Sequence, residues 1–279
     1  MMRSICFGIL LALATGFFVW GCRDRLRLML AGRSEARWDR LWERLRGVVV
    51  YAFGQRRVLR RKFGRNHFVI FWAFMVLLLA NGEFVASGLN PAWSLDFLPQ
   101  ALLCPLRFLF DAVSLLALLA VGVAALRRIF FPPDYLASRY VGARSGEAFL
   151  ILGFIALLML AYFILNGARI ALGSMHNASW MPISRMAGHL LDGLSPRTLH
   201  GVAVCAWWLH AVVLLAFMNV LPRSKHMHIL TIIPNIFFRK LEQPDLPPRE
   251  DFSSGTAFGV ADSKDFTWKD LLDTFSCAE

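Results

Sequence analysis

Residues 199–240 read LHGVAVCAWWLHAVVLLAFMNVLPRSKHMHILTIIPNIFFRK. The stretch begins with an apolar run that is long enough to cross a bilayer and carries His210 near its middle. Beyond Pro222 it turns basic and holds two more histidines, His226 and His228. In one continuous helix, His210 and His228 would share a face about 27 Å apart along the axis, with His226 about 160° away. This spacing nearly equals the hydrocarbon thickness of roughly 30 Å. It suits axial ligands of two stacked haems.

Simpler interpretations of these histidines stay open at this point. A single histidine in a membrane helix can hydrogen-bond a neighbouring helix, and a histidine in a basic segment can contact lipid headgroups. Polar groups at bilayer depth are costly and tend to be functional, so haem ligation is the sharper hypothesis for His210.

The composition is that of a polytopic membrane protein. Of the 279 residues, 57% are hydrophobic, and the mean hydropathy is +0.52. The net charge of +11 is explained by positive charge gathering on the cytoplasmic side, and nucleic acid is not an expected partner. The five cysteines show no regular spacing, so no disulfide framework is expected.

The sequence predicts an all-α membrane protein, a bundle of five transmembrane helices with the N-terminus outside and the C-terminus in the cytoplasm. The expected spans are 4–22, 67–85, 106–131 and 147–172, with a fifth that starts near residue 199. This arrangement satisfies the positive-inside rule at every loop and predicts a multi-pass protein of the cytoplasmic (inner) membrane. A signal peptide ending at Gly21-Cys22 is the alternative for the first run, but the dense basic segment that follows favours a retained helix.

An amphipathic helix is expected inside the basic segment 23–65. Its apolar residues recur at helical spacing against arginines. These apolar residues are Trp38, Leu41, Trp42, Leu45 and Val49, and the arginines are Arg37, Arg40, Arg44 and Arg46. The pattern is typical of a helix that lies on an anionic leaflet on the cytoplasmic side.

Polar residues near the outer ends of the spans have two interpretations. Asn81 and Glu83 could line a polar cavity, but an interfacial position is the preferred interpretation. The predicted outer loop 173–196 adds His176 and His189.

Two regions are predicted along the chain. Residues 1–240 form the membrane domain, and residues 241–279 form a proline-containing, solvated cytoplasmic linker followed by a short amphipathic stretch.

The motifs WWLH, LPRSKHMH and TIIPNIFFRK of the fifth span resemble a known family, as do RNHFVIFWAF at residue 65 and DFTWKDLLDTFSCAE at the chain end. This family of membrane oxidoreductases joins a nitrate-reductase-gamma-like cytochrome b domain to a heterodisulfide-reductase-like iron–sulfur domain. The resemblance covers essentially the whole chain and implies His67 and His228 as ligands of an inner haem, and His210 as a ligand of an outer haem.

One departure concerns the outer haem. In the nitrate reductase gamma subunit, helix two supplies a second histidine ten residues after the first, and that position is Leu77 here. His200 lies about 80° off the face of His210 and is not a same-face partner. His200, His189 or His176 could reach an outer site by another geometry. We therefore expect one haem b, and a second only if such a histidine substitutes.

The resemblance implies an electron-transfer subunit that exchanges electrons between membrane quinone and a cytoplasmic iron–sulfur module, either a domain or a subunit. A haem-free membrane anchor for a soluble reductase is the alternative. A transporter is a third hypothesis, supported by no broken-helix pair or repeat.

The sequence ends where the family begins its cysteine-rich cluster motif. Only Cys277 lies in the tail, and a 4Fe–4S cluster needs four ligands, so the cluster is expected in a missing C-terminal part or in the partner. A truncated chain, a split gene and a stop codon read as selenocysteine all fit this ending.

Overall fold

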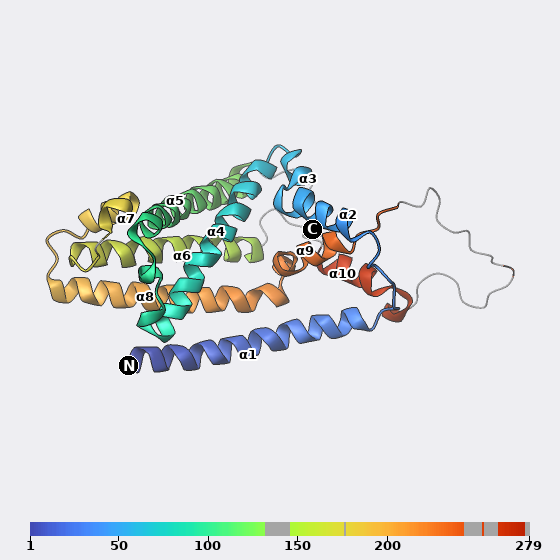
Figure 1. Ribbon diagram of the computed structural model, residues 1–279, viewed down its shortest axis with the longest axis horizontal. Helices are drawn as coiled ribbons and strands as arrows, with labels where there is room; N and C mark the ends of the chain where they lie inside the picture. Colours follow the sequence, from blue (N-terminus) through green and yellow to red (C-terminus); the bar gives the residue numbers. More distant parts are fainter. Residues whose placement is uncertain (132–145, 176, 243–252, 254–261, 277–279) are drawn as a thin grey trace. The chain divides into compact units, whose positions relative to one another are not determined.

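The computed structural model describes residues 1–131, 146–175, 177–242, 253 and 262–276 (Figure 1). Five helices in these ranges are long and apolar enough to cross a membrane. They are α1 (Met2–Leu30), α4 (Gly64–Leu89), α5 (Gln100–Phe130), α6 (Gly146–Ala171) and α8 (Pro196–Val220). The all-helical architecture with five apolar spans is thus confirmed, while the orientation of the termini stays a prediction.

Short helical elements lie between the long helices and after the last of them. They are α2 (Leu41–Gly47), η1 (Val48–Phe53), α3 (Arg56–Leu59), η2 (Pro91–Trp93), η3 (Leu95–Phe97), η5 (Ala178–Trp180), α7 (Pro182–His189), η6 (Leu221–Arg223), η7 (Lys225–Met227), α9 (His228–Phe237), η8 (Ser263–Asp265) and α10 (Trp268–Ser276). Within the described ranges, strand pairing is limited to an isolated bridge between Arg33 and Thr267.

The chain forms two compact units, each made of separate pieces. Unit 1 comprises residues 1–15 and 58–218, and unit 2 comprises residues 16–57 and 219–279. Helix α1 contributes to both. The boundary that the sequence predicts at residue 240 stays a prediction.

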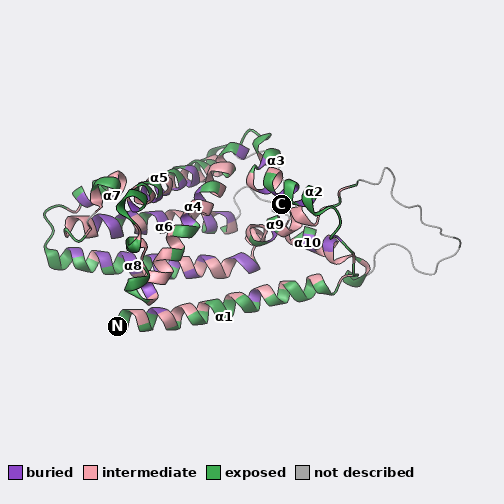
Figure 2. Cartoon of the chain, in the orientation of Figure 1, coloured by how far each residue is buried: buried purple, intermediate pink, exposed green. Residues whose placement is uncertain are grey.

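Small residues let the helices of unit 1 approach closely. Ala168 of α6 lies in one core cluster with Ala203, Ala206 and Ala211 of α8, and small side chains of this kind favour tight helix packing in membranes. Helix α5 packs against both α4 and α6, and Figure 2 shows buried residues on α5 and α6.

The first half of α1 is part of the unit 1 core. Phe7 is fully buried, and its ring packs edge-on against Trp207 with centroids 5.2 Å apart. A Cβ at Gly88 would lie 2.7 Å from the Phe7 ring, so only glycine admits this contact. Phe7 therefore ties the start of α1 to α4 and α8.

The region predicted as the loop 173–196 contains a helix, α7. Its N-terminus is capped by a residue of another helix, because Asp111 of α5 accepts hydrogen bonds from the backbone N–H groups of Ile183 (2.7 Å) and Ser184 (3.1 Å). The Ser184 hydroxyl donates to the same carboxylate. A charged carboxylate suits a helix N-terminus, so Asp111 fixes α7 against α5.

The expectation of one continuous helix through His210 and His228 is wrong. Helix α8 ends at Val220, a 3-10 turn that includes Pro222 follows, and Ser224 is extended with φ −120° and ψ 168°. Proline cannot continue the helical hydrogen-bond ladder, and the Ser224 hydroxyl accepts from the N–H of His226 at 3.1 Å to start the next turn. Helix α9 then begins at His228. The shared-face argument for the two histidines therefore fails.

Unit 2 is held together by a buried arginine. The side chain of Arg44 in α2 donates to the carbonyl oxygens of Phe237 (3.0 Å) and Arg239 (2.9 Å) at the C-terminal end of α9, and to the carboxylate of Asp39 at 2.6 Å. The last carbonyls of a helix lack intrahelical partners, and a guanidinium satisfies them and complements the helix dipole. Arg44 thus joins α2 to α9.

Residues 262–276 also pack into unit 2. The N–H of Arg33 donates to the Phe266 carbonyl at 2.8 Å, and the Trp268 indole donates to the Glu35 carbonyl at 2.8 Å. The ammonium of Lys269 is buried between Asn235 of α9 and Asp273. The expected amphipathic stretch is therefore a helix, α10, fixed to α9.

Candidate functional site

His210 lies in the core of unit 1 and pairs with α4. Its Nε2 atom is 3.0 Å from Oδ1 of Asn81, and its ring centroid is 4.5 Å from that of Phe84. The side-chain amide of Asn81 in turn donates to the Leu77 carbonyl at 2.9 Å. The Leu77 carbonyl can only accept a hydrogen bond, so the NH₂ group of Asn81 must point to Leu77. The side-chain oxygen of Asn81 then points to His210.

The hydrogen bond to Asn81 determines which ring nitrogen of His210 carries the proton. An amide oxygen accepts hydrogen bonds, so Nε2 of His210 carries the proton that it donates to Asn81. A protonated nitrogen has no lone pair to bind iron, and the Leu77 side chain is buried in the apolar core. In this arrangement the lone pair of the His210 ring is on Nδ1, and Leu77 offers no ligand atom to an outer haem. His210 as its ligand stays a prediction.

In His228 the proton lies on the other ring nitrogen, Nδ1. Its Nδ1 atom is 3.1 Å from the backbone oxygen of Lys225, to which only a protonated nitrogen can donate. The other nitrogen, Nε2, is then the one with the lone pair. Metal-bound histidines are commonly fixed by such a bond to a backbone carbonyl. The ring of His228 therefore fits an axial haem ligand.

The remaining candidate histidines lie in separate places. His67 is exposed in the first turns of α4 in unit 1, whereas His228 belongs to unit 2, so their pairing on one haem stays a prediction. His200 is exposed on α8, and His189 is exposed and 3.1 Å from Asp192. His176 lies outside the described residues. Within the described ranges, no group of three or more His, Cys, Asp or Glu side chains could hold a metal ion.

An ion-pair cluster is a feature that the sequence interpretation missed. Arg107 of α5 donates to both carboxylate oxygens of Glu83 on α4, at 2.9 and 2.7 Å, and to Asp96 at 3.1 Å. The N–H of Leu95 donates to Glu83 at 3.1 Å. An arginine inside an apolar span needs a counter-ion, and this was the available signal. Glu83 thus serves a paired, structural role between α4 and α5.

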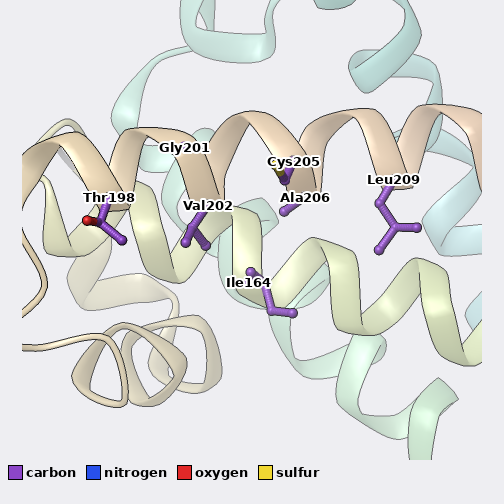
Figure 3. Close-up of a pocket in the computed structure, with 7 residues that line it drawn as sticks. All are labelled: Ile164, Thr198, Gly201, Val202, Cys205, Ala206 and Leu209. Atoms are coloured by element: carbon purple, nitrogen blue, oxygen red, sulfur yellow. The ribbon is translucent and has the colours of Figure 1, made fainter.

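An open apolar groove of about 650 Å³ runs along α8. Figure 3 shows it bordered by Ile164 of α6 and by residues of one α8 face, namely Thr198, Gly201, Val202, Cys205, Ala206 and Leu209. The side chains that line the groove are apolar except for the Thr198 hydroxyl and the Cys205 thiol, so the groove is mainly an apolar contact surface.

Two curated bacterial proteins are similar to this chain. The probable iron–sulfur-binding oxidoreductase FadF of Bacillus subtilis is 31% identical over 281 residues, which cover 99% of this chain and 39% of that protein. The EtfAB:quinone oxidoreductase of Syntrophomonas wolfei is 28% identical over 280 residues, which cover 96% of this chain and 38% of that protein. The chain therefore spans about two fifths of each relative. Neither a family model nor a solved structure matches it.

Proposed function

We propose that this chain is the membrane electron-transfer part of a quinone-linked oxidoreductase. It binds haem b through His67 and His228 and exchanges electrons between membrane quinone and an iron–sulfur module in the cytoplasm. The iron–sulfur module is a separate subunit or a further domain of the same protein. The names of the two relatives, an iron–sulfur-binding oxidoreductase and a quinone oxidoreductase, support this assignment.

The observation that carries the proposal is the state of the His228 ring. The bond from Nδ1 to the Lys225 carbonyl holds the imidazole as the tautomer with a lone pair on Nε2, as an iron ligand requires. When bound between two histidines, haem b supplies one-electron transfer rather than oxygen chemistry. Lys225 therefore acts as a positioning residue through its backbone.

The experiment compares reduced-minus-oxidised spectra of the purified parent with those of His67→Ala and His228→Ala. Each variant should lose the b-type signal and remain inserted in the membrane. His226→Ala is the matched control, because its ring lies in the same turn, with its centroid 5.9 Å from that of His228. It should keep the signal. Full haem content in both ligand variants would refute the assignment.

Reduction of the parent by a soluble quinol analogue tests the quinone link. The competing function, a haem-free anchor for a soluble reductase, predicts a colourless and well-folded parent protein. The same spectra distinguish the two functions.

A further inference from the structure

The segment that links α1 to α4 carries an exposed apolar face in unit 2. Leu41, Trp42, Leu45 and Val49 are between 49% and 80% exposed. At about 100° per residue, these four side chains lie within roughly one third of the helix circumference. Exposed residues of α2 are also visible in Figure 2. An apolar face this exposed is unusual in contact with water.

The remaining sides of α2 are either buried against α9 or polar. Arg44, Gly47 and Val48 are buried on the side that meets α9, where Arg44 binds the last carbonyls of that helix. Glu43 and Arg46 are exposed on the sector between the buried side and the apolar side. The bonds of Arg44 therefore prevent α2 from rotating to hide its apolar face.

We propose that the apolar face of α2 and η1 lies on an anionic lipid surface, with its side chains inserted at the level of the headgroups. The composition favours lipid over a protein partner. Trp38, 68% exposed, and Trp42 are amphipathic side chains suited to the interface. Arg46 and Arg56 are exposed in the same part of the chain, and their positive charges complement acidic headgroups.

The position of α2 and η1 in the chain also favours contact with lipid. The segment follows α1 and precedes α4, both of which are long and apolar enough to cross a membrane. A lipid surface is thus within reach of this face without any additional partner.

The experiment measures whether lipid or water contacts the apolar face of α2 and η1 in the full chain. The native cysteines are replaced by alanine, and an environment-sensitive fluorophore is attached through Trp42→Cys or Leu45→Cys. The matched control is Glu43→Cys, on the polar sector of the same helix. All proteins are placed in nanodiscs of phosphatidylcholine, with or without phosphatidylglycerol, and variants are compared only where their unfolding midpoints match the parent.

We expect a quencher attached to lipid chains to act several-fold more strongly at positions 42 and 45 than at the control position 43. Aqueous iodide should show the reverse order. Replacing Arg46 and Arg56 by Gln should weaken the lipid quenching at position 42 only when phosphatidylglycerol is present. Arg197→Gln, in unit 1, should leave it unchanged.

Three results would overturn the proposal. Equal iodide quenching at positions 42 and 43 would place the face in water. Protection from both quenchers would mean that a protein or a second copy covers it. Lipid quenching that is equal with and without phosphatidylglycerol would show that the face does not require anionic lipid.

Discussion

Nε2 of His210 and Oδ1 of Asn81 are 3.0 Å apart, and this hydrogen bond joins α8 to α4 inside unit 1. The bond gives His210 a structural role in the packing of these helices, while its role as a haem ligand stays a prediction. It also leads to a test of how many haems the protein binds.

His210→Ala should leave the haem-to-protein ratio near one, since the proposed haem is bound by His67 and His228. Stability should fall, and a double-mutant cycle with Asn81→Ala should give a coupling of about 1 kcal/mol, as expected for a hydrogen bond between membrane helices. Absorbance per protein and thermal unfolding in detergent measure the two quantities. A ratio near two in the parent that drops in His210→Ala would show that His210 binds iron.

A second prediction concerns the capping of α7 by Asp111. Asp111→Asn keeps the size of the side chain and removes the charge that the N–H groups of Ile183 and Ser184 contact. Hydrogen bonds to a charged group contribute roughly 1.5–3 kcal/mol, so amide exchange in α7 should become at least about tenfold faster. Exchange measured by mass spectrometry checks this. Asp192→Asn, at an exposed carboxylate, is the control, and similar exchange in both variants would contradict the capping role.

The spans could be predicted from sequence because their signal is local. A run of apolar residues of sufficient length needs a helix to satisfy its backbone whatever its neighbours are. The helix ends were less certain, as α5 shows. It starts at Gln100, before Pro105, although the sequence suggested a start after that proline.

Contacts between distant residues could not be predicted in the same way. Nothing near Asp111 in the sequence indicates that α7, more than 70 residues later, will supply its partners. The pairing of His210 with Asn81 likewise depends on how α4 and α8 pack. Pro222 indicates the break after Val220, but the extended conformation of Ser224, which ends the shared face of His210 and His228, has no such local signal.

A third prediction concerns pH. The hydrogen bond from Arg44 lowers the pKa of the Asp39 carboxyl below its usual value, with a smaller opposing effect of desolvation. A lowered pKa in the folded state stabilises the fold above the usual pKa of about 3.9, and this contribution is lost as the pH falls through the folded value. The unfolding midpoint of the parent should therefore fall more steeply on acidification below that pH than the midpoint of Asp39→Asn. Parallel curves for the two proteins would show that the Arg44–Asp39 pair adds no pH dependence.

The last prediction concerns α1, for which the sequence favours a retained helix over a signal peptide. In unit 2, Arg25 of α1 donates to the Pro222 carbonyl at 3.1 Å, and Arg223 donates to the Phe17 carbonyl of α1 at 3.2 Å. The Arg223 guanidinium also stacks over the Phe17 ring, 4.0 Å from its centroid. Two reciprocal arginine bonds thus hold α1 to the turn after α8.

We therefore expect the mature protein to retain α1, and intact mass measurement should show a chain that includes residues 1–21. Arg25→Gln should loosen this contact by roughly 1 kcal/mol, since the side chain is partly solvated, and should make the half-buried Cys22 about fivefold more reactive toward maleimide. Cys205, exposed on α8 in unit 1, serves as the internal control and should react at an unchanged rate. A mature chain that begins at Cys22 would contradict the prediction, because removing residues 1–21 would also remove Phe7 from the core of unit 1.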